Sequence, residues 1–167
     1  MSRTFRKAIS SDAAEIWQIL ADAIQRRKED GSQQWQDGYP NLAVVNKDIE
    51  KGYGFVLTEG SKILAYIALM LNDEPAYADI DGQWQTDGDF IVYHRVAVAQ
   101  DELGKGLAKQ LLKEVETYAQ QEKINSIRAD TNFDNLGMLS LFQKLGYKYC
   151  GEVSLRGSLR KAYEKVI

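Results

Sequence analysis

Two glycines separated by a lysine, Gly104, Lys105 and Gly106, stand between an apolar run and a pattern of helical period. Glycine lets the backbone turn sharply and approach a ligand closely. The first amides of a helix lack intrahelical partners and carry about half a positive charge. This combination suits a phosphate group, to which Lys105 and Lys109 could add countercharge. The alternative is a flexible turn into a purely structural helix.

Two familiar nucleotide-binding motifs do not fit these residues. A P-loop needs Ser or Thr directly after its lysine, and Gly106 stands there instead. The dinucleotide pattern Gly-x-Gly-x-x-Gly fails because Lys109 occupies the third glycine position. The turn therefore predicts a phosphate site of another kind.

The run from Leu103 to Ala108 resembles the coenzyme A motif of the GCN5-related N-acetyltransferase superfamily, Arg/Gln-x-x-Gly-x-Gly/Ala. Gly106 and Ala108 fit its last two positions, whereas Leu103 replaces Arg or Gln. Residues 130–147 are similar to a second cofactor segment of that superfamily, Asn-x-x-Ala-x-x-Leu-Tyr-x-Lys-x-Gly-Phe, which starts here at Asn135. Together with the order of elements, the resemblance covers essentially the whole chain.

This resemblance implies that the chain uses acetyl-CoA as acetyl donor and no metal. In the family, backbone amides of the glycine turn bind the pyrophosphate, and the preceding strand pairs with the pantetheine amides. Backbone N–H groups of that strand can also polarise the thioester carbonyl. The implied cofactor-binding residues are Val96, Ala97, Val98, Leu103, Gly104, Lys105, Gly106, Leu107, Ala108, Lys109, Asn135 and Phe142.

Two of these assignments leave alternatives open. Asn135 can contact the pantetheine arm, but asparagine at a helix start also caps free amides. Phe142 stands where many family members carry the tyrosine that protonates the departing thiolate, and phenylalanine has no such proton. Tyr147, Tyr149 or water remain as alternatives for that acid.

Acetyl transfer to an amine also needs a base, for which His94 and Glu74 are the candidate catalytic residues. His94 is the single histidine of the chain and lies just before Val96. Histidine is suited to proton transfer near neutral pH. Glu74 lies in a segment that leads towards the same strand. The alternatives are a histidine hydrogen-bonded within the sheet and a solvated loop carboxylate.

The acceptor site is expected in loop segments. Residues 72–90 contain six acidic residues and no Lys or Arg, so this segment would attract a cationic amine or simply keep a loop soluble. Trp35 and Tyr39 lie in the polar stretch 29–40, between two expected helices, where the family usually forms part of the acceptor site. We expect Trp35, Tyr39 and Glu74 to contact substrate, although the aromatic rings could instead pack the loop onto the body.

These residues need a scaffold of strands and helices. The patterns predict strands over 4–8, 53–58, 62–71, 90–99, 126–130, 147–154 and 161–167. They predict helices from Ile16 to Ile24, over 42–51 with Asn41 as its cap, after Gly106, and over 135–145. The order β-α-α-β-β-β-α-β-α-β-β indicates an α/β fold, with a mixed, mostly antiparallel sheet of about seven strands and four flanking helices.

Composition limits the class of protein. A chain of 167 residues with 44% hydrophobic content fits a single acetyltransferase domain over 1–167. The net charge of -3 disfavours nucleic acid and anionic membranes as partners. The first residues carry no apolar run typical of a signal or membrane span. Since Cys150 is the single cysteine, an internal disulfide is excluded, in agreement with a cytoplasmic location.

The sequence thus predicts an N-acetyltransferase in which a primary amine, expected to be a small molecule, attacks acetyl-CoA directly in a ternary complex. A non-catalytic acyl-CoA sensor is one alternative, motivated by the apolar Leu103 and Phe142. Acetylation of a protein or peptide is another. A homodimer is left open.

Overall fold

The computed structural model describes residues 2–167, which form two compact units. The first unit contains residues 2–69 and Arg95–Glu114, and the second contains Met70–His94 and Val115–Ile167. Within the described residues there are four α-helices and eight strands. The predicted α/β class is confirmed, and the strand count exceeds the expected seven by one very short strand.

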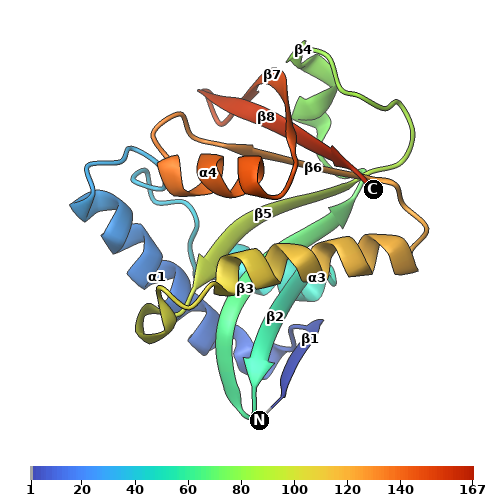
Figure 1. Cartoon of the computed structure of the whole chain (residues 1–167). Helices are drawn as coiled ribbons and strands as arrows, with labels where there is room; N and C mark the ends of the chain where they lie inside the picture. The colour runs from blue at the N-terminus through green and yellow to red at the C-terminus, as the bar shows by residue number, and fades with distance from the viewer. Residues whose placement is uncertain (1) are drawn as a thin grey trace. The chain divides into compact units, whose positions relative to one another are not determined.

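An antiparallel meander forms the sheet of the first unit (Figure 1). Strand β1, Arg3–Lys7, pairs with β2, Gly54–Glu59, and β2 pairs with β3, Lys62–Leu71. The turn between β2 and β3 places Gly60 at φ 59°, a conformation that glycine adopts at little cost. The predicted hairpin is therefore confirmed.

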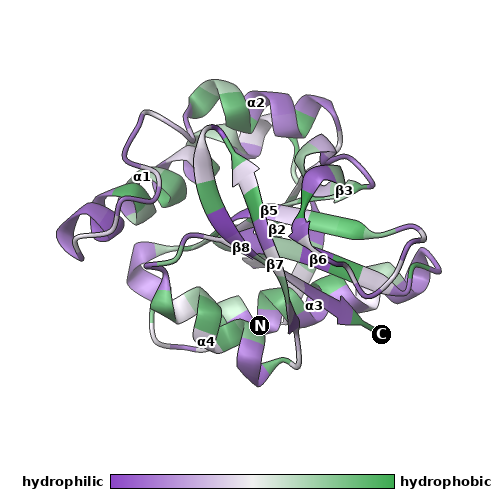
Figure 2. Cartoon of the chain, turned by 90° about the horizontal axis from the view of Figure 1, so that it is seen from above, coloured by the Kyte–Doolittle hydropathy of each residue, from purple (hydrophilic) through white to green (hydrophobic). Residues whose placement is uncertain are grey.

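Two amphipathic helices belong to this unit. Helix α1, Ala13–Glu29, and helix α2, Leu42–Glu50, each combine hydrophobic and hydrophilic residues along their length (Figure 2). The side chain of Asn41 accepts a hydrogen bond from the Val44 N–H at 3.0 Å, which confirms the predicted cap of α2.

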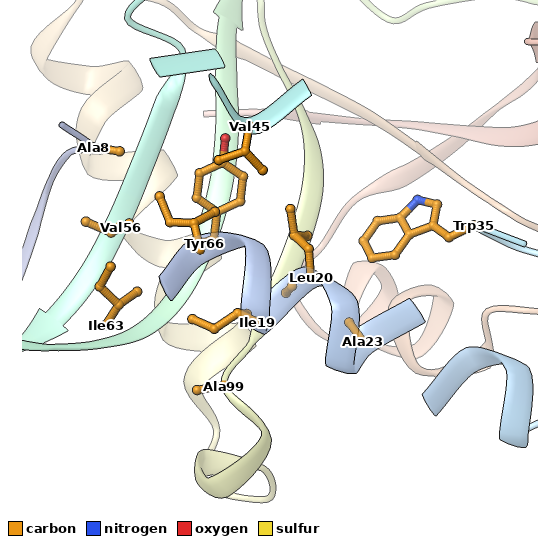
Figure 3. Close-up of a cluster of buried hydrophobic side chains, with 12 residues drawn as sticks. Ala8, Ile19, Leu20, Ala23, Trp35, Val45, Val56, Ile63, Tyr66 and Ala99 are labelled. Atoms are coloured by element: carbon orange, nitrogen blue, oxygen red, sulfur yellow. The ribbon is translucent and has the colours of Figure 1, made fainter. Parts of the chain in front are cut away.

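The core of the first unit lies between these helices and the meander. Figure 3 shows the ring of Tyr66 beside Val45, and Trp35 near Leu20 and Ala23 of α1. Full burial of a side chain such as Leu20 contributes about 1.5–3 kcal/mol. Because Trp35 belongs to this core, it holds the segment between α1 and α2 against the rest of the unit.

Strand β5, Ile91–Val98, and helix α3, Leu107–Gln121, each contribute residues to both units. A short 3-10 turn, Gln100–Glu102, lies between them. The predicted strand and the predicted helix after Gly106 are both confirmed.

The second unit contains the remaining strands and helix α4, Leu136–Lys144. Strand β6, Ser126–Thr131, and strand β7, Lys148–Leu155, both pair antiparallel with β8, Ser158–Val166. Strand β8 begins three residues before the expected position, because Arg156 and Gly157 form the tight turn that joins it to β7, with φ of 49° and 75°.

The segment expected as a loop before β5 contains two short elements, a 3-10 helix at Pro75–Asp79 and strand β4 at Asp81–Gly82. Strand β4 pairs with β7 at Gly151. A Cβ atom at Gly82 would lie 2.1 Å from the Cys150 carbonyl oxygen, so only glycine permits this close approach. This contact depends on residues distant in sequence, and the local pattern did not indicate it.

The hydrogen-bonded strands have a defined order in each unit. In the first unit the order is β1-β2-β3-β5, and in the second it is β5-β6-β8-β7-β4. The β5–β6 pair is parallel and the other pairs described above are antiparallel, as expected for a mixed sheet. None of the helices in residues 2–167 is long and apolar enough to cross a membrane.

Candidate active site

The glycine turn of the first unit is open at the start of α3. Gly104 and Gly106 have φ values of 78° and 74°, and a Cβ atom at either position would meet nothing within 4 Å. Within residues 2–167, no backbone hydrogen bond from the Gly104 or Gly106 amide is found. The turn therefore presents free N–H groups beside open space, which is the geometry that an anionic ligand requires.

The lysines near this turn differ in their surroundings. The Lys105 ammonium group donates to Glu102 at 2.8 Å, and Lys62 donates to the same carboxylate at 2.8 Å. Lys105 and Lys62 lower the pKa of Glu102 to about 2. Part of the countercharge expected from Lys105 is therefore already used within the protein, whereas Lys109 is exposed, as is Leu103.

Residues 96–98 of β5 form the second part of the predicted cofactor site. The parallel ladder between β5 and β6 includes only Ile91 and Val92, so the backbone of residues 96–98 lies outside it. Val96 and Ala97 are buried, and Val98 is half-buried. A strand segment without this ladder can pair with the amides of an extended ligand.

Arg95 precedes this segment and has a left-handed backbone, with φ of 58° in the middle of β5. Its guanidinium group donates to both oxygens of Asp48, with distances of 2.9 and 2.7 Å, and also donates to the Tyr39 hydroxyl. Tyr66 donates to Asp48 at 2.6 Å. A left-handed arginine costs on the order of 1–3 kcal/mol, so this buried cluster must hold it in place.

The charges in this cluster are stabilised by one another. Burial alone would lower the pKa of Arg95, but the neighbouring Tyr39 and Asp48 outweigh it and raise the pKa. Burial, followed by the charge of Asp48, raises the pKa of Tyr66. Arg95 therefore remains a cation, and Tyr66 remains a hydrogen-bond donor.

In the second unit, the two predicted catalytic residues lie together. His94 Nε2 and Glu74 Oε1 are 2.7 Å apart, a short hydrogen bond. Their side chains are 16% and 15% exposed, so both are largely shielded from bulk water.

A second carboxylate lies on the other side of the imidazole. Asp130 Oδ2 is 3.7 Å from His94 Nδ1 and accepts a hydrogen bond of 2.6 Å from the Tyr77 hydroxyl. Burial raises the pKa of Tyr77, which keeps the phenol protonated as a donor. Arg160 Nη1 lies 3.8 Å from Asp130 Oδ1. His94 is thus placed between two acidic side chains.

Aromatic and charged contacts fix the segment that carries Glu74. Trp84 donates its indole N–H to the Tyr77 carbonyl oxygen at 2.9 Å. The Arg128 guanidinium lies 4.5 Å from the Trp84 ring centre and 4.2 Å from the Phe90 ring centre. It also donates to the fully buried Glu164 at 3.2 Å. These contacts anchor the segment to β6 and β8 and so position Glu74.

The remaining predicted residues of the second unit have structural roles that the sequence left open. Asn135 Oδ1 accepts from the Met138 N–H at 3.1 Å, which confirms the helix cap. Phe142 is fully buried, and its ring packs against Tyr147 and Tyr163. The Tyr147 hydroxyl contacts that of Tyr93 at 3.2 Å, and burial raises the pKa of Tyr147.

The two aromatic residues expected at the acceptor site lie in the first unit. Trp35 is 6% exposed and belongs to the core, with the Arg27 guanidinium 3.9 Å from its ring centre. Tyr39 is half-buried and bonded to Arg95. Trp35 therefore packs its loop onto the body of the unit, which was the alternative to substrate contact, and Tyr39 has Arg95 as a polar partner.

Several charged residues at buried positions were not identified as candidate site residues from the sequence. Asp48 lies on the buried side of α2 beside Val45, and Arg95, Asp130 and Arg160 lie on strands. Charged side chains are rarely buried unless they are paired or functional. A charged residue within an otherwise apolar pattern was the signal that could have identified them. Among the described residues, no cluster of His, Cys, Asp and Glu is arranged to hold a metal ion.

Comparisons with known proteins all identify acetyltransferases. Residues 14–147 match the model of the acetyltransferase (GNAT) family. The uncharacterized N-acetyltransferase YesJ of Bacillus subtilis is 28% identical over 149 residues, covering 86% of this chain and 81% of YesJ. A GNAT family acetyltransferase from Streptococcus agalactiae is 32% identical with a TM-score of 0.89, covering 99% of this chain and 95% of that chain.

A more distant solved structure adds information on a ligand. A chain from Salmonella typhimurium, determined with its cofactor acetyl-CoA, has a TM-score of 0.64 and 18% identity. It covers 99% of this chain and 94% of that one. At this identity the likeness concerns the fold alone.

Proposed function

The chain belongs to the acetyltransferase (GNAT) family, and from this premise we propose that it transfers the acetyl group of acetyl-CoA to a primary amine of a small molecule. The observation that carries the proposal is the 2.7 Å contact between His94 and Glu74. Because the family match includes parts of both units, we treat residues 1–167 as one acetyltransferase domain.

Two features of the first unit support acetyl-CoA as the donor. The open turn at Gly104 and Gly106 would bind the pyrophosphate through backbone amides, with the start of α3 adding a favourable dipole. Residues 96–98 would pair with the pantetheine amides and donate to the carbonyl oxygen that gains charge during attack. Losing one such donor typically costs about 3 kcal/mol of barrier.

Glu74 and His94 would take a proton from the bound ammonium group, which leaves the neutral amine that attacks the thioester. As the amine nitrogen bonds to the carbonyl carbon, the carbon–sulfur bond breaks and the sulfur leaves as a thiolate, which takes up a proton. Both His94 and Val96 belong to β5, where they are two residues apart in the sequence. Tyr147 is buried and bonded to Tyr93, which favours water as the acid at sulfur.

Direct transfer is favoured over an acyl-enzyme intermediate. Cys150 is the single cysteine and is buried, and its thiol donates to the Lys148 carbonyl oxygen at 3.4 Å. Burial raises the pKa of the Cys150 thiol, which disfavours the nucleophilic thiolate. A small acceptor is favoured because Glu74 and His94 are largely enclosed.

Steady-state thiol release tests the proposal. Purified protein, acetyl-CoA and a panel of polyamines, amino acids, aminoglycosides and short peptides would be assayed for free thiol. We expect release only with particular small amines and intersecting double-reciprocal lines, as a ternary complex requires. Parallel lines would indicate a covalent intermediate. Calorimetric acetyl-CoA binding without release by any amine would favour a sensor, and release only with peptides would favour a peptide acetyltransferase.

A further inference from the structure

Arg160 of β8 is a buried cation, and within residues 2–167 its Nε atom has no hydrogen-bond partner. The residue is 7% exposed, and the Nε atom itself is buried. The Asp130 Oδ1 atom lies 3.8 Å from its Nη1 atom, which exceeds hydrogen-bond distance. Most buried polar groups are hydrogen-bonded, so an arginine that lacks such bonds needs an explanation.

Another buried arginine of the same unit, Arg128, has hydrogen-bond acceptors for its guanidinium group. Arg128 is 5% exposed, and it donates to Glu164 and to the Thr86 carbonyl oxygen while its flat face contacts two aromatic rings. Arg160 has none of these partners. The difference indicates that the guanidinium group of Arg160 is kept available for a ligand.

The surroundings of Arg160 indicate which ligand this is. Asp130 separates Arg160 from His94, with one carboxylate oxygen near each of them. Glu74 lies on the far side of His94. A cation thus lies close to the His94 and Glu74 pair proposed to handle the amine proton. A molecule that carries an amine and an anion a few bonds apart would contact both.

We propose that Arg160 binds the carboxylate of the acceptor and that the acceptor is therefore an α-amino acid, acetylated on its amine. This inference rests on the proposed function. The planar guanidinium can donate two parallel hydrogen bonds to a carboxylate. The amine of the same molecule would then lie beside Asp130 and His94, on the side of His94 that faces Arg160.

Local charge favours a carboxylate over a dianionic phosphate. Asp130 and Glu74 both lie near the site and would repel a second negative charge. An α-amino acid enters as a zwitterion, with its ammonium group facing acidic side chains and its carboxylate facing Arg160. A simple amine would leave the donors of the guanidinium without a hydrogen-bond acceptor, which a site built for a charged partner disfavours.

Paired probes test this subsite. The twenty common amino acids and their carboxamides, which lack the negative charge, would be compared by thiol release with wild type, Arg160→Gln and Arg160→Lys. In wild type we expect kcat/KM for the best amino acid to exceed that of its carboxamide by about 10- to 100-fold. Arg160→Gln should raise KM for the amino acid by a similar factor and leave the carboxamide unaffected, with Arg160→Lys between them.

A matched control lies on the same hairpin. Arg156 is exposed in the turn between β7 and β8, so Arg156→Gln makes the same chemical change away from the site and should leave both KM values unchanged. Thermal unfolding with and without each amino acid would provide a second readout that does not need turnover. We expect a stabilising shift in wild type and none in Arg160→Gln.

The outcomes separate this inference from the proposed function. Thiol release with carboxamides or simple amines at least as fast as with amino acids would overturn the carboxylate subsite and leave acetyl transfer intact. Discrimination that survives in Arg160→Gln would also overturn it. No release with any amine would contradict acetyl transfer, and the thermal shift would then decide the subsite alone, with Arg160-dependent stabilisation supporting it and its absence overturning it.

Discussion

Replacing Glu74 by glutamine tests the centre of the proposed mechanism. Glutamine has nearly the same shape, and its amide can still contact His94 Nε2 across the 2.7 Å separation observed for the carboxylate. The amide cannot take up a proton at neutral pH. The substitution therefore removes proton uptake while it preserves packing in the segment before β5.

The expected effects on rate and stability differ greatly in size. A positioned base contributes roughly 10²- to 10⁴-fold, so kcat should fall by that factor, equivalent to about 3–5.5 kcal/mol of barrier. Loss of one charge-assisted hydrogen bond at a half-buried position should lower the free energy of unfolding by about 1 kcal/mol. In a chain of this size that lowers Tm by about 2–4 °C.

Thiol release at saturating amine and acetyl-CoA measures kcat, and thermal unfolding measures the change in stability. Glu122→Gln provides the matched control, because Glu122 is exposed beyond the end of α3 and should keep both values. If kcat for Glu74→Gln stayed within twofold of wild type, Glu74 would have no role in proton transfer.

Three further substitutions test other parts of the structure. Gly106→Val should raise the Kd for acetyl-CoA at least tenfold by calorimetry, whereas Gly31→Val, at a similar φ of 78° and with equal space, should cost only stability. Cys150→Ala should retain full kcat, since the thiol is buried, and loss of turnover in a folded variant would restore a covalent mechanism. Glu164→Gln should lower the free energy of unfolding by about 3 kcal/mol near neutral pH, because it leaves the buried guanidinium of Arg128 without its counterion. Burial alone would raise the pKa of Glu164, but its hydrogen bonds outweigh burial and lower the pKa. The loss of stability in the variant should therefore be fully present above the unfolded-state pKa of about 4.3 and should shrink as the pH falls through the pKa of the folded state. Urea unfolding at about pH 7 and at about pH 3 would measure this difference.

Local patterns were sufficient to predict the main elements of this fold. Helical periodicity after Gly106 and the asparagine caps at Asn41 and Asn135 depend on residues within one or two turns, and the structure has them as expected. Strand β4 depends instead on the pairing of Gly82 with Gly151, which are far apart in the chain. Its two residues also show no alternation that a pattern could detect.

The candidate site was predictable only where a residue type restricts the chemistry. A single histidine near the strand and a nearby carboxylate were enough to propose His94 and Glu74, but their contact joins residues that are 20 positions apart. Asp130 and Arg160 could not be assigned, because a charged residue on a strand does not indicate its partner. Trp35 shows the converse, since a large aromatic in a polar stretch can line a pocket or, as here, complete a core.

Arg95 connects these observations through the backbone of β5. It follows the proposed base His94 directly and precedes Val96, the first of the residues proposed to bind acetyl-CoA. Its left-handed conformation is unfavourable for arginine, and the bidentate contact with Asp48 compensates for that cost. Because a change in φ at a residue reorients the backbone that follows it, release of Arg95 from Asp48 would displace the backbone of Val96. The buried pair is therefore expected to position the proposed acetyl-CoA donors of residues 96–98, although neither Asp48 nor Arg95 need contact the substrate.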